Sequence, residues 1–237
     1  MNLGFQYGTQ YIDFNVIFKK RKTMGIQIDS SGQVKVISPI GISEEDILRI
    51  VKTKAKWIIQ KQYDIKSING GKINREAVNG ESYMYLGRNY SLQLVDDKSI
   101  KEISVRLLQG KFIVTTNTRN QDKIKLALEK WYREKTLKRV TERIKYYKKY
   151  FKEDVTDIKV KEQKKRWASC TWNDELLFNW RCVMAPSNVL DYIVVHEMCH
   201  MVHKNHSKDF WNLVGEIMPD YISRKTWLKE NGIKLDL

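Results

Sequence analysis

The four histidines are the feature of this sequence that most restricts its fold and chemistry. All of them lie between His196 and His206 in a chain of 237 residues. His196, Glu197 and His200 form the pattern His-Glu-x-x-His, and residues four apart lie on one face of a helix. If the segment is helical, both imidazoles can bind one metal ion, while Glu197, about 100° further round, contacts a water molecule that the metal holds. The spacing predicts a zinc hydrolase site.

The segment that carries this motif is expected to be a central, buried helix over about 187–204. Apolar residues lie on nearly all of its sides, including Val189, Leu190, Ile193, Val194, Met198 and Met201. Buried histidines and a buried glutamate are costly without partners, and a metal ion with its water would satisfy all of them. A chance match of core residues to the motif is the alternative, and the gathering of every histidine in one segment argues against it.

The third metal ligand has two candidates. His203 returns to the face of the first motif histidine but lies about 10 Å from it along a helix axis. His206 follows the second motif histidine by six residues, as in His-Glu-x-x-His-x-x-Gly-x-x-His enzymes. It reaches the metal only if the chain turns near Asn205, a residue type that tolerates the conformation ending a helix. The sequence favours His206 over His203, with Glu216 as a weaker carboxylate candidate.

The net charge of +15 is unevenly distributed. Residues 1–120 hold 19 Lys and Arg against 11 Asp and Glu, residues 121–150 hold 11 against 4, and residues 151–237 hold 13 against 13. No nucleic-acid-binding motif accompanies the basic residues. We therefore expect a lysine-rich solvated surface, with a nucleic-acid-binding face as the alternative.

The composition predicts a globular protein that lies in the cytoplasm and has no membrane partner. Hydrophobic residues make up 42% of the chain, no apolar run reaches the ~20 residues of a membrane helix, and the first residues do not resemble a signal peptide. The three cysteines, Cys170, Cys182 and Cys199, are odd in number and form no Cys-x-x-Cys pair. We expect them to be reduced thiols.

The hydrophobic pattern predicts an α+β fold with a change of composition near residue 120. Residues 1–120 read as a region rich in β-hairpins, with one helix over about 43–66 and no internal repeat beyond the hairpin rhythm. Residues 121–237 are predicted to hold a long helix over 121–150, a hairpin over 158–183 and the motif helix.

Segments around the histidines resemble the YgjP-like metallopeptidases, a family related to the SprT-like and WLM groups. The resemblance is strong over about 155–215 and looser towards Arg21–Met24 and Ser38-Pro39. The matching segments are Lys165–Cys170, Leu176–Arg181, Ala185-Pro186, Tyr192–Glu197, Asn205–Ser207 and Phe210-Trp211. Cys199 and His203 stand where small or apolar residues are expected, which leaves the ligand set intact.

This resemblance implies a zincin-like region, with the motif helix packed on a small, mostly antiparallel sheet. It implies one zinc ion per chain, bound by His196, His200 and His206, and Glu197 as the catalytic residue. It does not supply the natural substrate.

Hydrolysis also needs a donor for the developing oxyanion. The candidates for this role or for substrate contact are Arg166, Asn179, Arg181 and Tyr192. From the order along the chain, the segment 176–182 is expected to be the edge strand that pairs with an extended peptide.

The leading hypothesis is a zinc-dependent metallopeptidase that acts on a peptide or protein. Two alternatives remain open. One is a nucleic-acid-associated, SprT-like protease recruited by its basic N-terminal region, and the other is a non-catalytic interaction protein that zinc stabilises.

Overall fold

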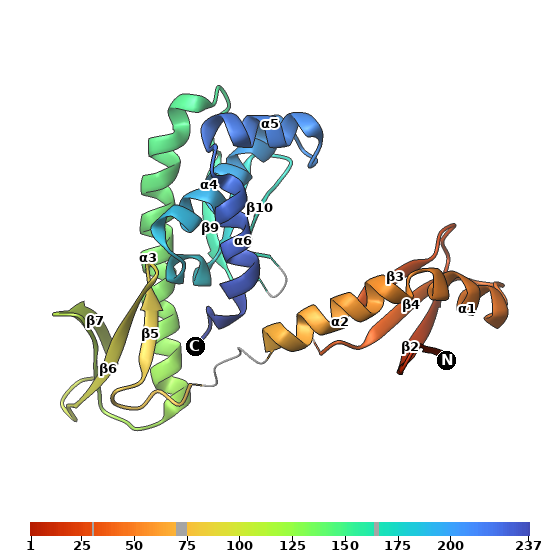
Figure 1. Cartoon of the computed structure of the whole chain (residues 1–237). Coiled ribbons are helices and arrows are strands. Elements are labelled where there is room, and N and C mark those ends of the chain that lie inside the picture. The colour runs from red at the N-terminus through yellow and green to blue at the C-terminus, as the bar shows by residue number, and fades with distance from the viewer. Residues whose placement is uncertain (30, 70–74, 164–165) are drawn as a thin grey trace. The chain divides into compact units, whose positions relative to one another are not determined.

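The fold is taken from a computed structural model, which describes residues 1–29, 31–69, 75–163 and 166–237 (Figure 1). The chain forms two compact units, Met1–Lys72 and Ile73–Leu237. The composition change near residue 120, where we expected the boundary, lies inside the second unit, because the strands before it pack on the helix after it. No helix among the described residues is long and apolar enough to cross a membrane.

The first unit is built on a four-stranded sheet. Its strands are β1 (Asn2–Tyr7), β2 (Gln10–Lys19), β3 (Gly25–Ile28) and β4 (Val34–Pro39), in the order β1-β2-β4-β3. β1 and β2 pair antiparallel, as do β3 and β4, whereas β2 and β4 pair parallel. Alternating residues such as Ile12, Phe14 and Val36 point to one face and form the core of this unit.

Two helices cover that face, α1 (Glu44–Thr53) and α2 (Ala55–Asn69). The sequence predicted one helix here. The chain breaks at Lys54, which has φ −104° and ψ 7°. The buried residues Val51, Ala55 and Ile58 continue the spacing of a single helix across the break, so periodicity alone does not reveal it.

The second unit begins with a sheet of the same topology. Its strands are β5 (Ser82–Tyr85), β6 (Arg88–Asp96), β7 (Ser104–Leu108) and β8 (Lys111–Thr116), in the order β5-β6-β8-β7. Two antiparallel pairs are again joined by a central parallel pair, β6 and β8. The chain therefore contains an internal structural repeat that the sequence did not reveal.

The helix that follows each sheet begins in the same way. Ser43 caps α1 and Asn120 caps α3 (Gln121–Tyr147), each by accepting a hydrogen bond from the N–H three residues on. Fully buried apolar residues follow four and eight residues after each cap: Ile47 and Val51 in the first unit, Ile124 and Leu128 in the second. The repeat is preserved in burial and capping rather than in residue identity, which is why reading the sequence missed it.

The helix α3 is much longer than α1 and packs against two parts of the second unit. Its first half packs on the sheet, where the Tyr132 hydroxyl donates to the Met84 carbonyl. Its second half carries Thr136, whose hydroxyl donates to the Trp180 carbonyl, and it ends in η1 (Lys148–Tyr150). The second half thus supports the part of the fold that holds the histidines.

A three-stranded sheet lies beside this half of α3. It comprises β9 (Asp157–Lys161), β10 (Ala168–Cys170) and β11 (Glu175–Asn179), in the order β10-β11-β9, followed by η2 (Trp180–Met184). β10 and β11 form the antiparallel hairpin, and β9 joins β11 in parallel. The segment 176–182 is therefore not an edge strand, because β11 is paired on both sides and residues 180–182 have left the sheet.

The motif helix is α4 (Ser187–Val202), followed by α5 (Lys208–Ile217), α6 (Tyr221–Asn231) and η3 (Gly232–Lys234). α4 packs against α3, α5, α6 and β10, and most of its residues are buried (Figure 1). The Arg143 guanidinium of α3 binds both carboxylate oxygens of Asp191 on α4, and Tyr147 donates to the same carboxylate. The α+β class predicted from the sequence is confirmed.

Candidate metal centre

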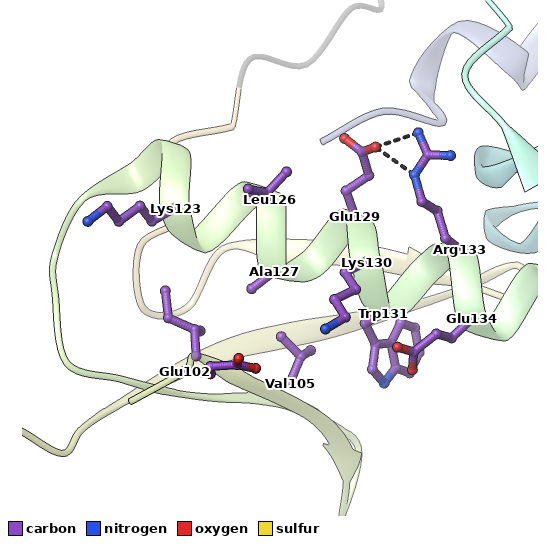
Figure 2. A pocket seen from close by; sticks show the side chains of 11 residues that line it. Glu102, Val105, Lys123, Leu126, Ala127, Glu129, Lys130, Trp131, Arg133 and Glu134 are labelled. Atoms are coloured by element: carbon purple, nitrogen blue, oxygen red, sulfur yellow. Dashed lines mark hydrogen bonds and ion pairs between the residues drawn. The ribbon is translucent and has the colours of Figure 1, made fainter. Parts of the chain in front are cut away.

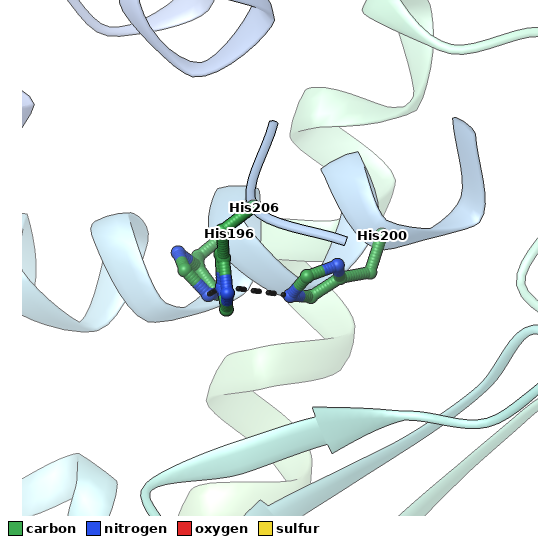
Figure 3. A group of neighbouring side chains, drawn as sticks. All are labelled: His196, His200 and His206. Carbon is green, nitrogen blue, oxygen red and sulfur yellow. Dashed lines mark hydrogen bonds between the residues drawn. The ribbon is translucent and has the colours of Figure 1, made fainter. Parts of the chain in front are cut away.

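Three histidine side chains converge at one point of the second unit (Figure 3). His196 and His200 come from α4, and His206 comes from the segment between α4 and α5. The Nε2 atom of His206 lies 3.0 Å from Nε2 of His196 and 3.1 Å from Nε2 of His200. His203 and Glu216, the other sequence candidates, are not among the side chains of this cluster.

The end of α4 explains why His206 reaches the other two rings. The helix stops at Val202, and His203 adopts an extended conformation with φ −123° and ψ 103°. Asn205 accepts a hydrogen bond from the N–H of Ser207, which then caps α5. The chain therefore reverses between the two helices, as the position of Asn205 led us to expect. His203 contributes its carbonyl oxygen, 3.0 Å from Nδ1 of His200.

Hydrogen bonding and burial keep the histidines in the form that binds metals. Because a carbonyl only accepts, Nδ1 of His200 carries the proton, and Nε2 of the neutral ring offers its lone pair to the cluster. Burial lowers the pKa of all three histidines, and it lowers that of His196 to about 3. At neutral pH the three rings are therefore uncharged, which is the form in which histidine can bind a metal.

The spacing of the nitrogens fits a zinc ion. Two nitrogens bound to tetrahedral zinc at about 2.05 Å lie about 3.3 Å apart, close to the 3.0 Å and 3.1 Å observed. Three protein ligands leave the fourth position free for a reactant, which distinguishes catalytic from structural zinc sites. The donor set and its geometry therefore fit a catalytic metal.

Aromatic residues of α5 hold the rings in place. The indole of Trp211 stacks on the His206 ring, with centroids 5.5 Å apart, and Phe210 lies 4.9 Å from the His196 ring. Among the described residues, the buried Nδ1 atom of His196 has no hydrogen-bond partner. Packing therefore fixes the His196 ring. The sequence drew attention to Phe210 and Trp211 only through the family resemblance.

Glu197 is buried between α4 and β10, with 6% of its surface exposed. Burial raises the pKa of its carboxyl group to about 8, although a hydrogen bond from the Cys170 N–H and the nearby charge of Arg166 oppose the shift. A carboxyl group with such a pKa can accept or release a proton near neutral pH.

β10 presents an unpaired main-chain edge beside Glu197. Asn179 donates to the Trp167 carbonyl, and Thr171 donates to the Glu175 carbonyl. Bonds of an antiparallel pair recur at every second residue, so the main-chain groups of Ala168 and Cys170 point away from β11. The Cys170 N–H meets Glu197 there, and no other strand of the described residues pairs with this edge.

The four further candidates from the sequence lie in different surroundings. Tyr192 lines a pocket together with His196 and Glu197. Arg166 is exposed, and its positive charge acts to lower the pKa of Glu197.

The polar groups of Asn179 and Arg181 are bonded elsewhere. The Asn179 amide donates to the carbonyls of Gln163 and Arg166. Arg181 forms ion pairs with Glu162 and Asp236. Lys165, the first residue of one segment that carries the resemblance, lies outside the described residues.

A second concave region lies between α3 and β7 and has a volume of about 590 Å³ (Figure 2). Val105 and Trp131 contribute apolar surface to it, and Glu129 and Arg133 form an ion pair along α3. The described residues that line it include no histidine or cysteine, so it has none of the chemistry of the histidine cluster.

Comparison with known families identifies the family of this chain. The family model for the YgjP-like metallopeptidase domain matches residues 22–231. The chain therefore belongs to the YgjP-like metallopeptidase family, which confirms the resemblance noted in the sequence. No curated protein matches the chain.

Proposed function

We propose that this chain is a zinc-dependent peptidase in which Glu197 transfers the proton needed for peptide-bond hydrolysis. The observation that carries the proposal is the convergence of three neutral histidines next to Glu197, a buried residue of the helix that carries two of them. Membership of a metallopeptidase family supports it. Zinc held by His196, His200 and His206 would lower the pKa of a water molecule and polarise the substrate carbonyl.

Glu197 is suited to move the proton. Its carboxyl group is desolvated, which raises its pKa, whereas a cation bound at the histidines would favour the charged form. The carboxylate can then accept a proton from the attacking water and return it to the leaving amine.

The main chain of β10 is suited to hold the substrate. An extended peptide can pair with the free edge of β10 through the N–H and C=O groups of Ala168. We propose Tyr192 and Arg166 as donors to the developing oxyanion. Burial raises the pKa of the Tyr192 phenol, so the hydroxyl keeps its proton and can donate it in a hydrogen bond.

The test combines zinc content with hydrolysis of an unfolded-protein or peptide library. Glu197→Gln should bind one zinc ion per chain like the wild type but cleave about 100- to 10,000-fold more slowly. Glu216→Gln, at an exposed position on α5, serves as the matched control and should cleave normally. Equal cleavage by Glu197→Gln, or a purified chain without zinc affinity, would refute the proposal.

A basic loop of the first unit favours nucleic acid as a second candidate partner. Lys19, Lys20, Arg21 and Lys22, at the end of β2 and in the connection to β3, are all exposed. Binding through such a loop should weaken steeply with added salt and should fall in a Lys20→Ala/Arg21→Ala variant. Salt-independent binding would exclude this electrostatic recruitment.

We propose that the protein acts in the cytoplasm, because Cys170, Cys182 and Cys199 are free thiols.

The other alternative is a non-catalytic protein that zinc stabilises. Such a protein would keep its cellular function in the Glu197→Gln variant, whereas a peptidase would lose it.

A further inference from the structure

A small pocket opens directly beside the histidine cluster. Its volume is about 190 Å³, and His196 and Glu197 are among the residues that line it. The remaining walls come from three separate parts of the second unit: Trp167 and Ala168 at or just before the start of β10, Tyr192 and Ile193 on α4, and Leu228 on α6. Any group that enters the pocket therefore lies next to the site of the chemistry.

The C-terminal segment closes the pocket and holds its shape. Leu228 is 9% exposed, so its side chain is already packed into the wall. Gly232 lies against the Trp167 indole. A Cβ atom at residue 232 would come within 2.7 Å of Cζ2 of Trp167. Beyond it, Asp236 is anchored by its ion pair with Arg181. These contacts indicate a pocket that exists before a ligand arrives.

Four of the seven residues that line the pocket carry apolar side chains, which favours an apolar occupant. These four are Trp167, Ala168, Ile193 and Leu228, and the polar groups come from Tyr192, His196 and Glu197. An apolar cavity of about 150 Å³ binds benzene in an engineered protein, so this volume accommodates a phenyl ring or a branched aliphatic chain.

We propose that this pocket binds a bulky apolar side chain of the substrate, such as that of phenylalanine, leucine or methionine, adjacent to the bond that is hydrolysed. The inference rests on the proposed peptidase function and adds a substrate preference to it. An extended peptide on the β10 edge runs past Ala168, which is itself part of the pocket wall. Every second side chain of such a peptide faces the same way, so one of them can enter.

The first test measures binding rather than turnover. Peptide-like hydroxamates chelate zinc directly, and a series with benzyl, isobutyl or methyl side chains differs only in the group offered to the pocket. Calorimetry on the zinc-loaded wild type should show the benzyl and isobutyl compounds binding at least about 10-fold more tightly than the methyl compound. Equal affinities across the series would overturn the pocket assignment.

The second test changes the pocket. Leu228→Trp should fill it and reduce the benzyl-to-methyl affinity ratio to about one, with zinc content unchanged. Ile222→Trp, which adds the same indole at a position of α6 that is 64% exposed, should preserve the ratio. Leu228→Ala enlarges the pocket and should favour a naphthylmethyl over a benzyl compound, which keeps the test decisive if the tryptophan variant does not fold.

These outcomes separate the pocket from the peptidase function. Zinc binding with hydrolysis but no side-chain preference, or a preference that Leu228→Trp leaves intact, would refute the pocket alone. Selective hydroxamate binding by a protein that cleaves no peptide would support the pocket and refute the peptidase. A chain that binds no zinc would refute both.

Discussion

The two four-stranded sheets share a strand order, yet among the described residues only the second belongs to a unit with a candidate metal centre. In both, two antiparallel pairs are joined by a parallel pair, and a capped helix covers one face. α1 has 10 residues and α3 has 27. The first part of α3 packs against the sheet of its own unit, as α1 does in the first unit. The repeated architecture is therefore a scaffold that does not itself create a site.

The extra length of α3 makes the difference. Beyond the part that covers the sheet, Val140 and Ile144 are buried in the same core as the motif helix, and the buried Thr136 donates to the Trp180 carbonyl. Arg143 and Tyr147 then bind Asp191 on α4. The candidate metal centre thus depends on elements that follow the repeat in the chain, and we expect changes made in one unit to leave the other unaffected.

Removal of zinc should produce the largest difference in hydrogen exchange between the two units. A ligand at 1,000 times its Kd stabilises the folded state by about 4 kcal/mol. Chelation should therefore accelerate amide hydrogen exchange in α4 and α5 by up to about 1,000-fold. Exchange in β1–β4 should not change, because no histidine lies in the first unit. A comparable acceleration in both units would contradict the separation.

Matched valine substitutions provide a smaller perturbation. Val36 and Val114 occupy equivalent inward positions of β4 and β8, and both are fully buried. Each change to alanine should lower the free energy of unfolding of its own unit by about 2 kcal/mol. Hydrogen exchange, analysed separately for each unit, measures these losses of stability. Zinc titration measures the effect of each substitution on metal binding. If Val36→Ala weakened zinc binding, the two units would be coupled.

In the metal-free protein, Glu197 should make the stability of the second unit depend on pH differently from that of the first. Its pKa is raised to about 8 in the folded state, so folding favours the protonated form, and stability falls as pH rises from about 4.5 to 8. The histidines have lowered pKa values, and they oppose this trend only below about pH 6.5.

Between pH 6.5 and 8 the metal-free second unit should therefore lose about 1–2 kcal/mol of stability. Chemical denaturation at a series of pH values measures the loss. Glu197→Gln should abolish it, and the first unit should not show it, because its described buried residues include no acid. An unchanged slope in Glu197→Gln would show that another group is responsible.

The candidate site was more predictable than the domain organisation. His196, Glu197, His200 and His206 could be singled out because helical spacing and the need for a turn at Asn205 depend on nearby residues. Sequence also supplied the α+β class. The unit boundary, the helix break at Lys54 and the edge position of β10 depend on packing between distant segments, which local periodicity does not encode. The repeat escaped notice for a related reason, since Ser38 and Thr116 are equivalent buried residues without being identical.

We propose that His206, rather than His203, completes the metal centre. The measurement is zinc affinity, determined by competition with a chelator, for His206→Ala and for His203→Ala as the matched control. Because His203 contributes only its main-chain carbonyl, His203→Ala should bind zinc about as tightly as the wild type. His206→Ala should bind it about 100-fold or more weakly. Unchanged affinity in His206→Ala, or its loss in His203→Ala, would contradict the proposed ligand set.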